Sequence, residues 1–258
     1  MPTETGRARA STAGRREPIR RQRDQVQDPV LDGFQLTDRD RTIARFIAVH
    51  RMVTSAQIGR RMGIAIPGTV QRRLRALREA GFVQRVSPFV EGQSPVYLVT
   101  RKGLRWLGLA LPPPSASLAT WVHDLAVVDL AVSLELAGSA VVTERQMRSS
   151  DARGQADPKW GVSLSAVGRP RTRWHFPDLV SDLTTAWEIE RAPKTSLRLE
   201  KIVEGYRWSR RYAKVVYLVE SRPIHNLLTK LTEVPALPER LGPAGSGTAF
   251  EIRGWPEP

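Results

Sequence analysis

The sequence predicts an α+β protein in which a small helical unit ending in a β-hairpin precedes a mixed α/β domain. Three observations support this prediction. Apolar residues recur at helical spacing and then alternate across residues 34–111. A run of prolines and serine follows, and from residue 119 onward strand-like and helix-like segments alternate. With 258 residues, the chain is long enough for two modest domains.

The first 33 residues are rich in Arg and poor in large apolar side chains. Such a segment cannot bury enough surface to offset the entropy lost on ordering, so we expect residues 1–33 to form a disordered basic tail. Its arginines could touch phosphates, or they could belong to a solvated tail with interspersed acids.

Local signals mark three helices within residues 34–111: a cap residue, a capping-box pair or a proline at each start, and glycines at two ends. In chain order these residues are Asp38, Thr54 with Gln57, Gly63, Pro67 and Gly81. Two strands at 83–86 and 96–99 follow, joined by a turn-rich loop, and a helix at 102–109 closes the unit. Three helices and a two-stranded wing predict a winged helix-turn-helix whose third helix reads DNA.

Residues 112–118 contain three prolines and two serines and are expected to be a linker. Residues 119–258 are expected to form a mixed α/β domain with parallel strand pairs, because strands alternate with helices. After a helix at 123–136, the expected segments are a strand from Val141, a long loop or ragged hairpin at 149–171, strands at 175–183 and 185–191, a helix at 196–210, a strand at 214–219, a helix at 223–231 and a strand at 249–253.

Positive charge is concentrated in the first unit. Residues 37–110 hold fourteen Lys or Arg and four Asp or Glu, which is +10 of the chain's +14. A hydrophobic core does not require this concentration, but a surface that meets a polyanion does. We therefore expect the third helix and the wing to contact double-stranded DNA; a solvated helix face and a protein-docking module are the alternatives. The expected DNA contacts are Thr69, Gln71, Arg72, Arg73, Arg75, Arg78 and Arg85.

Several classes of protein lack support in the sequence. The chain has no cysteine, which excludes a disulfide framework and a zinc finger and predicts a reducing, cytoplasmic location. No apolar run is long enough for a membrane span, and the N-terminus has no apolar secretory segment. The patterns GxxxxGK[ST], GxGxxG and GxSxG are missing, so ATP, dinucleotide and serine-hydrolase chemistry is not expected.

Carboxylates gather in two neighbouring predicted strands. Asp178 lies in the first strand, and alternation places Glu188 and Glu190 on one face of the next. Carboxylates held together repel one another unless a cation neutralises them, and their hard oxygens suit Mg²⁺, which could activate water against a phosphodiester. The alternative is an exposed strand face whose acids are solvated or paired with Arg191 and Arg198.

Histidines give weaker indications. His123, at the start of the helix after the linker, is either a proton acceptor near these carboxylates or a cap or packing residue. Asp129 and Glu135 on the same helix are candidates for a further metal ligand. His50, His175 and His225 show no metal-ligand spacing, and we expect His50 and His225 at the surface.

Asp178 and the run Glu188-Ile189-Glu190 resemble the signature of the PD-(D/E)xK nucleases, with Glu190 where that family has Lys. The resemblance implies a restriction-endonuclease-like fold for the second domain. It also implies that Asp178 and Glu188 hold Mg²⁺, that Glu190 assists catalysis, and that Lys201 on the following helix takes the place of the missing lysine.

A longer series of motifs runs through residues 36–220. In order they are Leu36-Thr37-Asp38-Arg39-Asp40, Tyr97-Leu98-Val99-Thr100, Lys102-Gly103, His123-Asp124-Leu125-Ala126-Val127, Phe176-Pro177-Asp178 and Trp187-Glu188-Ile189-Glu190. The series resembles the replication-relaxation family, whose members are found on plasmids, conjugative elements and phages, chiefly in Gram-positive bacteria. The resemblance implies a DNA-acting protein in plasmid replication or DNA relaxation.

Three hypotheses about function remain open at this point. In the first, the winged helix binds DNA and the second domain cleaves it with Mg²⁺. In the second, the protein is a non-enzymatic regulator whose second domain forms a homodimer or recruits a partner. In the third, the winged helix docks on proteins of a replication or transfer assembly.

Overall fold

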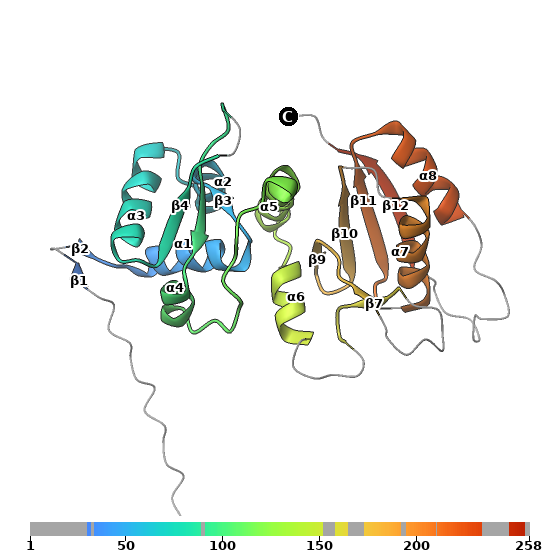
Figure 1. Ribbon diagram of the computed structural model, residues 1–258, viewed down its shortest axis with the longest axis horizontal. Coiled ribbons are helices and arrows are strands. Elements are labelled where there is room, and N and C mark those ends of the chain that lie inside the picture. The colour runs from blue at the N-terminus through green and yellow to red at the C-terminus, as the bar shows by residue number, and fades with distance from the viewer. Residues whose placement is uncertain are drawn as a thin grey trace, which may run out of the picture.

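The structure is a computed structural model that describes residues 30–31, 34–88, 91–151, 158–164, 173–191, 195–209, 211–233 and 248–255. Helices and mixed sheets make up two lobes, with one long helix between them (Figure 1). The α+β class predicted from the sequence is confirmed. In the described part of the chain, no helix combines the length and the apolar character that a membrane crossing requires.

The N-terminal lobe consists of helices around a three-stranded antiparallel sheet in the order β3-β5-β4. Its elements are β1 (Val30–Leu31), β2 (Phe34–Gln35), α1 (Asp38–Val49), β3 (Val53–Thr54), α2 (Ser55–Met62), α3 (Pro67–Glu79), β4 (Val83–Val86), β5 (Val96–Val99) and α4 (Arg101–Trp106). Strand β1 lies inside the segment expected to be a disordered tail and pairs with β2. The rest of that segment lies outside the described residues.

The helix ends follow the local signals with one exception. Thr54 and Gln57 form the predicted capping box of α2, Gly63 ends that helix in the left-handed conformation, and Pro67 begins α3. Helix α1, however, is capped by Thr37 and not by Asp38, because Thr37 and Asp40 form a reciprocal capping box that satisfies two backbone N–H groups.

The C-terminal lobe is built on a five-stranded sheet in the order β12-β11-β10-β9-β6. Strands β10, β11 and β12 are parallel, while β9 runs antiparallel to both β10 and β6. The elements of this half are η1 (Leu118–Thr120), α5 (Trp121–Leu136), β6 (Val141–Thr143), α6 (Glu144–Asp151), β7 (Val162–Ser163), β8 (Trp174–His175), β9 (Leu179–Ser181), β10 (Thr185–Glu190), α7 (Ser196–Ser209), β11 (Lys214–Val219), α8 (Arg222–Glu233) and β12 (Ala249–Gly254).

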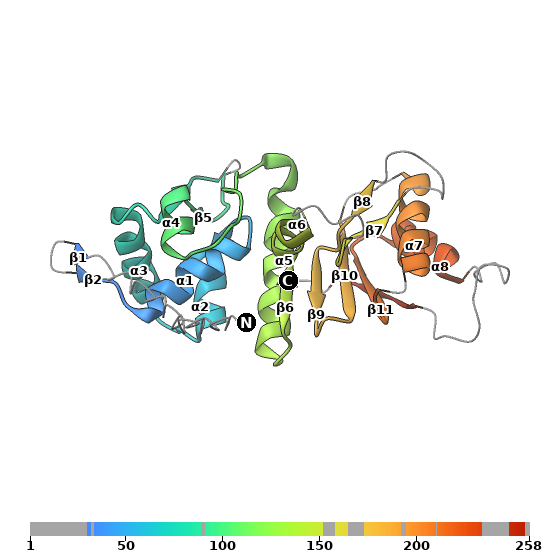
Figure 2. The same cartoon turned by 90° about the horizontal axis from the view of Figure 1, so that it is seen from below.

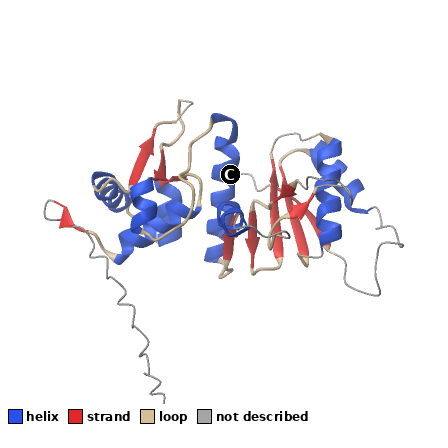
Figure 3. Ribbon diagram, turned by 60° about the horizontal axis from the view of Figure 1, so that its bottom comes forward, coloured by secondary structure: helices blue, strands red, loops and turns tan. Residues whose placement is uncertain are grey.

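Helices cover both faces of this sheet, and successive side chains of β10 and β11 pack against the helices on opposite faces. Ala186 and Tyr217 pack against α7 and α8 on one face, whereas Trp187 and Ile189 pack toward α5 on the other (Figure 3). The parallel pairs predicted from the alternation of strands and helices are present. Helix α6 was not predicted, since its residues are mostly polar and lack a clear apolar period.

Helix α5 belongs to the cores of both lobes. Val128 and Val132 pack into the N-terminal core, while Ala126 and Ala131 pack against the sheet (Figure 2). A helix with apolar residues on opposite sides is expected to be covered on both.

The two lobes also share hydrogen bonds at the end of α1. The hydroxyl of Thr143 donates to the carbonyl of Val49 at 2.7 Å, and Nε of Arg145 donates to the carbonyl of Ala48 at 3.3 Å. The last carbonyls of a helix have no partner within the helix, so donors from outside stabilise them. The C-terminal half therefore helps to cap a helix of the N-terminal lobe.

Candidate functional site

Helix α3 presents arginines to solvent because its apolar side chains face inward. Val70, Leu74 and Leu77, at positions i, i+4 and i+7, are buried as predicted. The side chains on the other faces include three exposed arginines and exposed Gln71, while Thr69 is half-buried. The exposed arginines are Arg72, Arg75 and Arg78.

Two of the residues predicted to contact DNA make contacts within the lobe. Nη1 of Arg73 lies 3.2 Å from Oδ2 of the fully buried Asp40, so this arginine ties α3 to the start of α1. The hydroxyl of Tyr97 donates to Oε1 of Gln71 at 3.2 Å, which holds α3 against strand β5. Arg85 lies opposite Tyr97 in the β4–β5 pair and is exposed, so it shares a sheet face with a residue that touches α3.

Over the described ranges, the arginines of α2 form ion pairs with acids, unlike the exposed arginines of α3. Nη1 of Arg60 lies 2.9 Å from Oδ1 of Asp129, and Nε of Arg61 lies 2.8 Å from Oε2 of Glu135. Both acids lie on α5, so these pairs join the lobes, and the two further metal-ligand candidates Asp129 and Glu135 each pair with an arginine. Among the residues that the structure describes, the four exposed arginines of α3 and β4 form no ion pair: Arg72, Arg75, Arg78 and Arg85.

Asp178 does lie beside the strand that carries Glu188 and Glu190, and the two glutamates are buried. Glu188 and Glu190 on β10 are each 1% exposed, so the exposed-face alternative does not apply. Asp178 lies in the bend before β9 and not within a strand. Its Oδ2 accepts the backbone N–H of Ile189 at 2.8 Å. Since Ile189 directly follows Glu188 on β10, this bond holds Asp178 close to Glu188.

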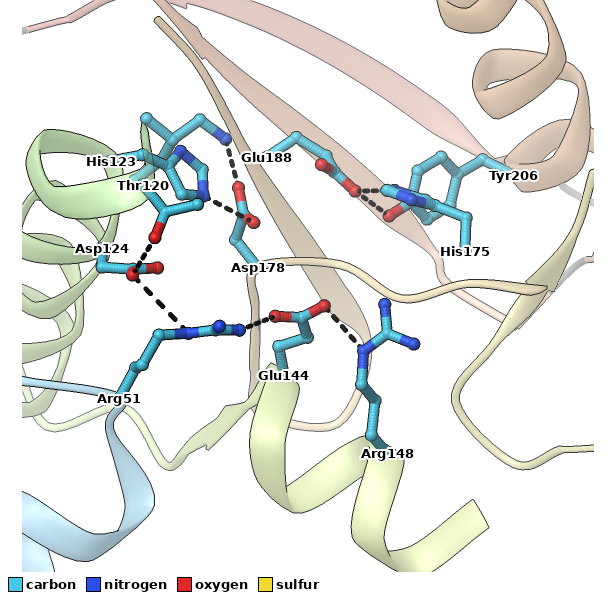
Figure 4. A network of polar contacts seen from close by, with 11 residues as sticks. Arg51, Thr120, His123, Asp124, Glu144, Arg148, His175, Asp178, Glu188 and Tyr206 are labelled. Carbon is cyan, nitrogen blue, oxygen red and sulfur yellow. Dashed lines mark hydrogen bonds and ion pairs between the residues drawn. The ribbon is translucent and has the colours of Figure 1, made fainter. Parts of the chain in front are cut away.

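Each of two carboxylates is paired with a histidine (Figure 4). Nε2 of His123 lies 3.2 Å from Oδ1 of Asp178, and Nε2 of His175 lies 2.6 Å from Oε1 of Glu188. The hydroxyl of Tyr206 donates to the same oxygen of Glu188. Burial, and then the charge of Glu188, raises the pKa of Tyr206 well above its usual value, so this phenol remains a donor.

A second buried phenol lies on the strand next to Glu188. Tyr217 is paired with Glu188 across β10 and β11. Burial, followed by the charges of Glu188, Glu190 and Asp178, raises the pKa of Tyr217. Its hydroxyl is buried and has no hydrogen-bond partner within the described ranges.

Polar residues at the junction of the lobes continue this network (Figure 4). Arg51 lies 3.5 Å from Asp124 and 3.8 Å from Glu144, and Glu144 also pairs with Arg148 at 2.7 Å. Burial raises the pKa of Asp124, while a hydrogen bond from Thr120 and the charge of Arg51 oppose that rise.

His50 was predicted at the surface and is in fact buried, at 3% exposure. Its ring lies edge-on to Phe46, and it lines a small pocket together with Thr143 and Arg145. Burial, and then the charges of Arg145 and Arg61, lower the pKa of His50 to about 3. Local sequence carried no signal for this burial, because Thr143 and Arg145, which lie beside His50, are more than ninety positions away in the chain.

The side chains implied by the nuclease signature do not form a ready Mg²⁺ site as they lie. No three His, Asp or Glu side chains gather as a metal-binding group in the part of the chain described. Mg²⁺ requires a near-octahedral set of oxygens, yet Asp178 and Glu188 each already face a histidine. Lys201 is exposed on α7, and within the described residues it forms no ion pair with either acid.

The chain matches a known family over most of its folded part. A family model described as replication-relaxation matches residues 45–216, which is more than half of the chain. The chain belongs to the replication-relaxation family.

The matched residues begin within α1 and end within β11, so the replication-relaxation match includes both lobes and α5 between them. Membership indicates a role in the replication or relaxation of mobile elements. No curated protein and no solved structure matches the chain.

Proposed function

We propose that this replication-relaxation protein binds double-stranded DNA through the exposed arginines of α3, in the manner of a winged helix-turn-helix. Helix α3 enters the major groove, and the β4–β5 hairpin lies against the neighbouring backbone. The bound DNA belongs to a plasmid, phage or conjugative element whose replication or relaxation the protein serves.

The observation that carries the proposal is the contrast between two helices of one lobe. The arginines of α2 are neutralised by acids of α5, whereas Arg72, Arg75 and Arg78 have no such partner among the described residues. Helix α3 also lies on the side of the lobe away from α5 (Figure 1). Unneutralised guanidinium groups on one outer face repel one another, and a phosphate backbone relieves that repulsion.

The role of each residue predicted to contact DNA follows from its position on α3 or on the wing. Gln71 lies near the start of α3, and while its oxygen accepts from Tyr97, its amide N–H₂ group can donate to a base edge. Arg75 and Arg78 lie further along the helix and suit phosphates. Arg85 on β4 supplies a contact from the wing, while Arg73 serves the fold through Asp40.

Metal-dependent cleavage by Asp178, Glu188, Glu190 and Lys201 is supported less well than DNA binding. All three acids raise the pKa of Tyr217, but Asp178 and Glu188 pair with histidines, and Lys201 forms no ion pair with either of these two acids in the described residues. A DNA-binding protein that does not cleave fits the same geometry. If Asp178→Ala abolishes Mg²⁺-dependent nicking of plasmid DNA, the cleaving version is correct.

The test of DNA binding compares two double variants that each remove two positive charges. Arg72→Ala/Arg75→Ala changes α3, and the control Arg222→Ala/Lys230→Ala changes exposed cations on α8, at the far end of the molecule (Figure 1). Each contact is worth about 1–3 kcal/mol, so the α3 variant should bind a labelled duplex at least about thirtyfold more weakly than the parent. Equal affinities for the α3 variant and the parent would remove α3 from the interface.

A further inference from the structure

A second basic surface lies in the C-terminal lobe, far from α3 in the sequence. A pocket of about 370 Å³ opens between α6, β8 and the first turns of α7. Its lining includes Arg148, Arg173, Arg198 and Lys201, and none of the described residues that line it is acidic. Concave sites of 300–1,000 Å³ are the usual size for small ligands in proteins.

The charge of this pocket is only partly compensated. Arg148 pairs with Glu144 at 2.7 Å, but that acid also pairs with Arg51. Arg198 and Lys201 form no ion pair with any acid in the described ranges. Cations that share one concave wall repel one another more strongly than on a flat surface, because the surrounding protein screens them less than water does.

The start of helix α7 adds to this positive potential. Thr195, which precedes the helix, and Arg198 in its first turn both line the pocket. The N-terminal end of a helix carries a partial positive charge and directs backbone N–H groups outward, which favours a bound anion there.

The inner wall of the pocket is held rigidly. His175 lines the pocket, and its Nε2 lies 2.6 Å from the buried Oε1 of Glu188. Tyr206 donates to that same oxygen. The carboxylate that holds the imidazole ring is therefore itself held by a second hydrogen bond. Trp174, half-buried beside His175, offers an aromatic surface.

We propose that this pocket binds the phosphate group of a nucleotide, with Arg198 and Lys201 contacting the phosphate oxygens and Trp174 stacking on the base. Stacking of bases on aromatic side chains combined with cationic contacts to phosphates is how proteins hold unpaired nucleotides. The nucleotide is either free or the phosphorylated end of a strand. The site uses none of the α3 residues, so the inference does not depend on the DNA contact proposed for them.

The experiment uses the full chain with Arg72→Ala/Arg75→Ala, so that α3 does not contribute to binding. Four probes are titrated by calorimetry at 0.15 M salt: a 5′-phosphorylated trinucleotide, the same trinucleotide without the phosphate, a deoxynucleoside monophosphate, and inorganic phosphate. The phosphorylated trinucleotide should bind at least about tenfold more tightly than its unphosphorylated form. A monophosphate that binds as tightly as the trinucleotide identifies a free nucleotide as the ligand, and weaker binding of the monophosphate identifies a strand end.

Arg198→Gln/Lys201→Gln should lower the affinity for the phosphorylated probe at least about tenfold, while the control Lys230→Gln leaves it unchanged. Thermal melting checks that both variants fold. Equal binding of the two trinucleotides, or unchanged binding by a folded Arg198→Gln/Lys201→Gln variant, overturns the pocket assignment. Loss of duplex binding in the α3 variant bears only on the function proposed for α3, so the two proposals fail separately.

Discussion

Nη1 of Arg73 lies 3.2 Å from Oδ2 of Asp40, and that carboxylate is completely buried. The same oxygen accepts the backbone N–H of Thr37 at 2.8 Å, so one acid caps α1 and anchors α3. Arg73 therefore differs from its neighbours on α3, although all these arginines look alike in the sequence.

Replacing Arg73 should lower stability, whereas replacing Arg75 should not. Arg73→Ala leaves the buried carboxylate of Asp40 without its cation, and breaking a buried pair costs about 3 kcal/mol. Arg75 is exposed, so Arg75→Ala should change the free energy of unfolding by less than about 0.5 kcal/mol. Urea denaturation measures both. Equal midpoints for the two variants would contradict the anchoring role of Arg73.

The salt dependence of duplex binding should report the α3 contacts directly. Each phosphate contact contributes close to one unit to the slope of log affinity against log salt concentration. Arg72→Ala/Arg75→Ala should therefore reduce that slope by about two when both side chains contact phosphates. A slope equal to that of the parent, or almost no salt dependence in the parent, would instead favour a protein-docking surface.

Two tyrosines beside Glu188 form a natural pair of variants. Tyr206→Phe removes a donor to the buried Oε1 of Glu188 and should destabilise the protein by about 1–3 kcal/mol. Tyr217→Phe removes a buried hydroxyl that has no partner in the described structure and should be neutral or slightly stabilising. Thermal melting of both variants measures their stabilities. A greater loss of stability for Tyr217→Phe than for Tyr206→Phe would show that the hydroxyl of Tyr217 has a partner.

Glycine 103 is required by a close approach between backbones. A Cβ atom on Gly103 would lie 2.2 Å from the carbonyl oxygen of Phe82, which also accepts the N–H of Thr100 at 2.9 Å. Gly103→Ala should cost at least about 2 kcal/mol, because that carbonyl cannot move without losing its hydrogen bond. Gly68→Ala meets no atom within 4 Å and should stabilise by about 0.5–1 kcal/mol. Similar denaturation midpoints for both variants would exclude the clash.

Local chemistry explains what could be predicted from the sequence. The capping box of Thr54 and Gln57, the proline at the start of α3 and the apolar spacing of Val70, Leu74 and Leu77 each depend on neighbours within one or two turns. The shared face of Glu188 and Glu190 follows from the strand period of two. These features do not depend on how distant segments pack.

Contacts between segments far apart in the sequence determine the features that could not be predicted. The contact of His175 with Glu188 depends on how β8 packs beside β10. Arg60 and Arg61 pair with acids of α5 that lie about seventy residues later in the chain. No local pattern separates these paired arginines from the exposed ones of α3. The sequence therefore drew attention to Asp178 and Glu188, but not to the side chains of His175 and Tyr206 as partners of Glu188.

The burial of His50 predicts a specific sensitivity to acid. Its pKa is about 3 in the folded protein, against 6.5 for an ordinary histidine. Between these values the unfolded chain binds a proton that the folded chain does not, so the free energy of unfolding falls as the pH falls. The slope is about 1.4 kcal/mol for each pH unit. His50→Gln removes this term, and from pH 6 to pH 4.5 it should lose about 2 kcal/mol less than the parent.

His225→Gln provides the control, because His225 is partly exposed on α8 and lies outside the junction of the lobes. Urea denaturation at several pH values measures the slopes, and the carboxylates contribute equally to all three proteins. The His50→Gln curve should be flatter than the other two, even when its stability at neutral pH is lower. Parallel curves for His50→Gln and the parent would show that His50 takes up its proton without opening the contact between α1 and Arg145.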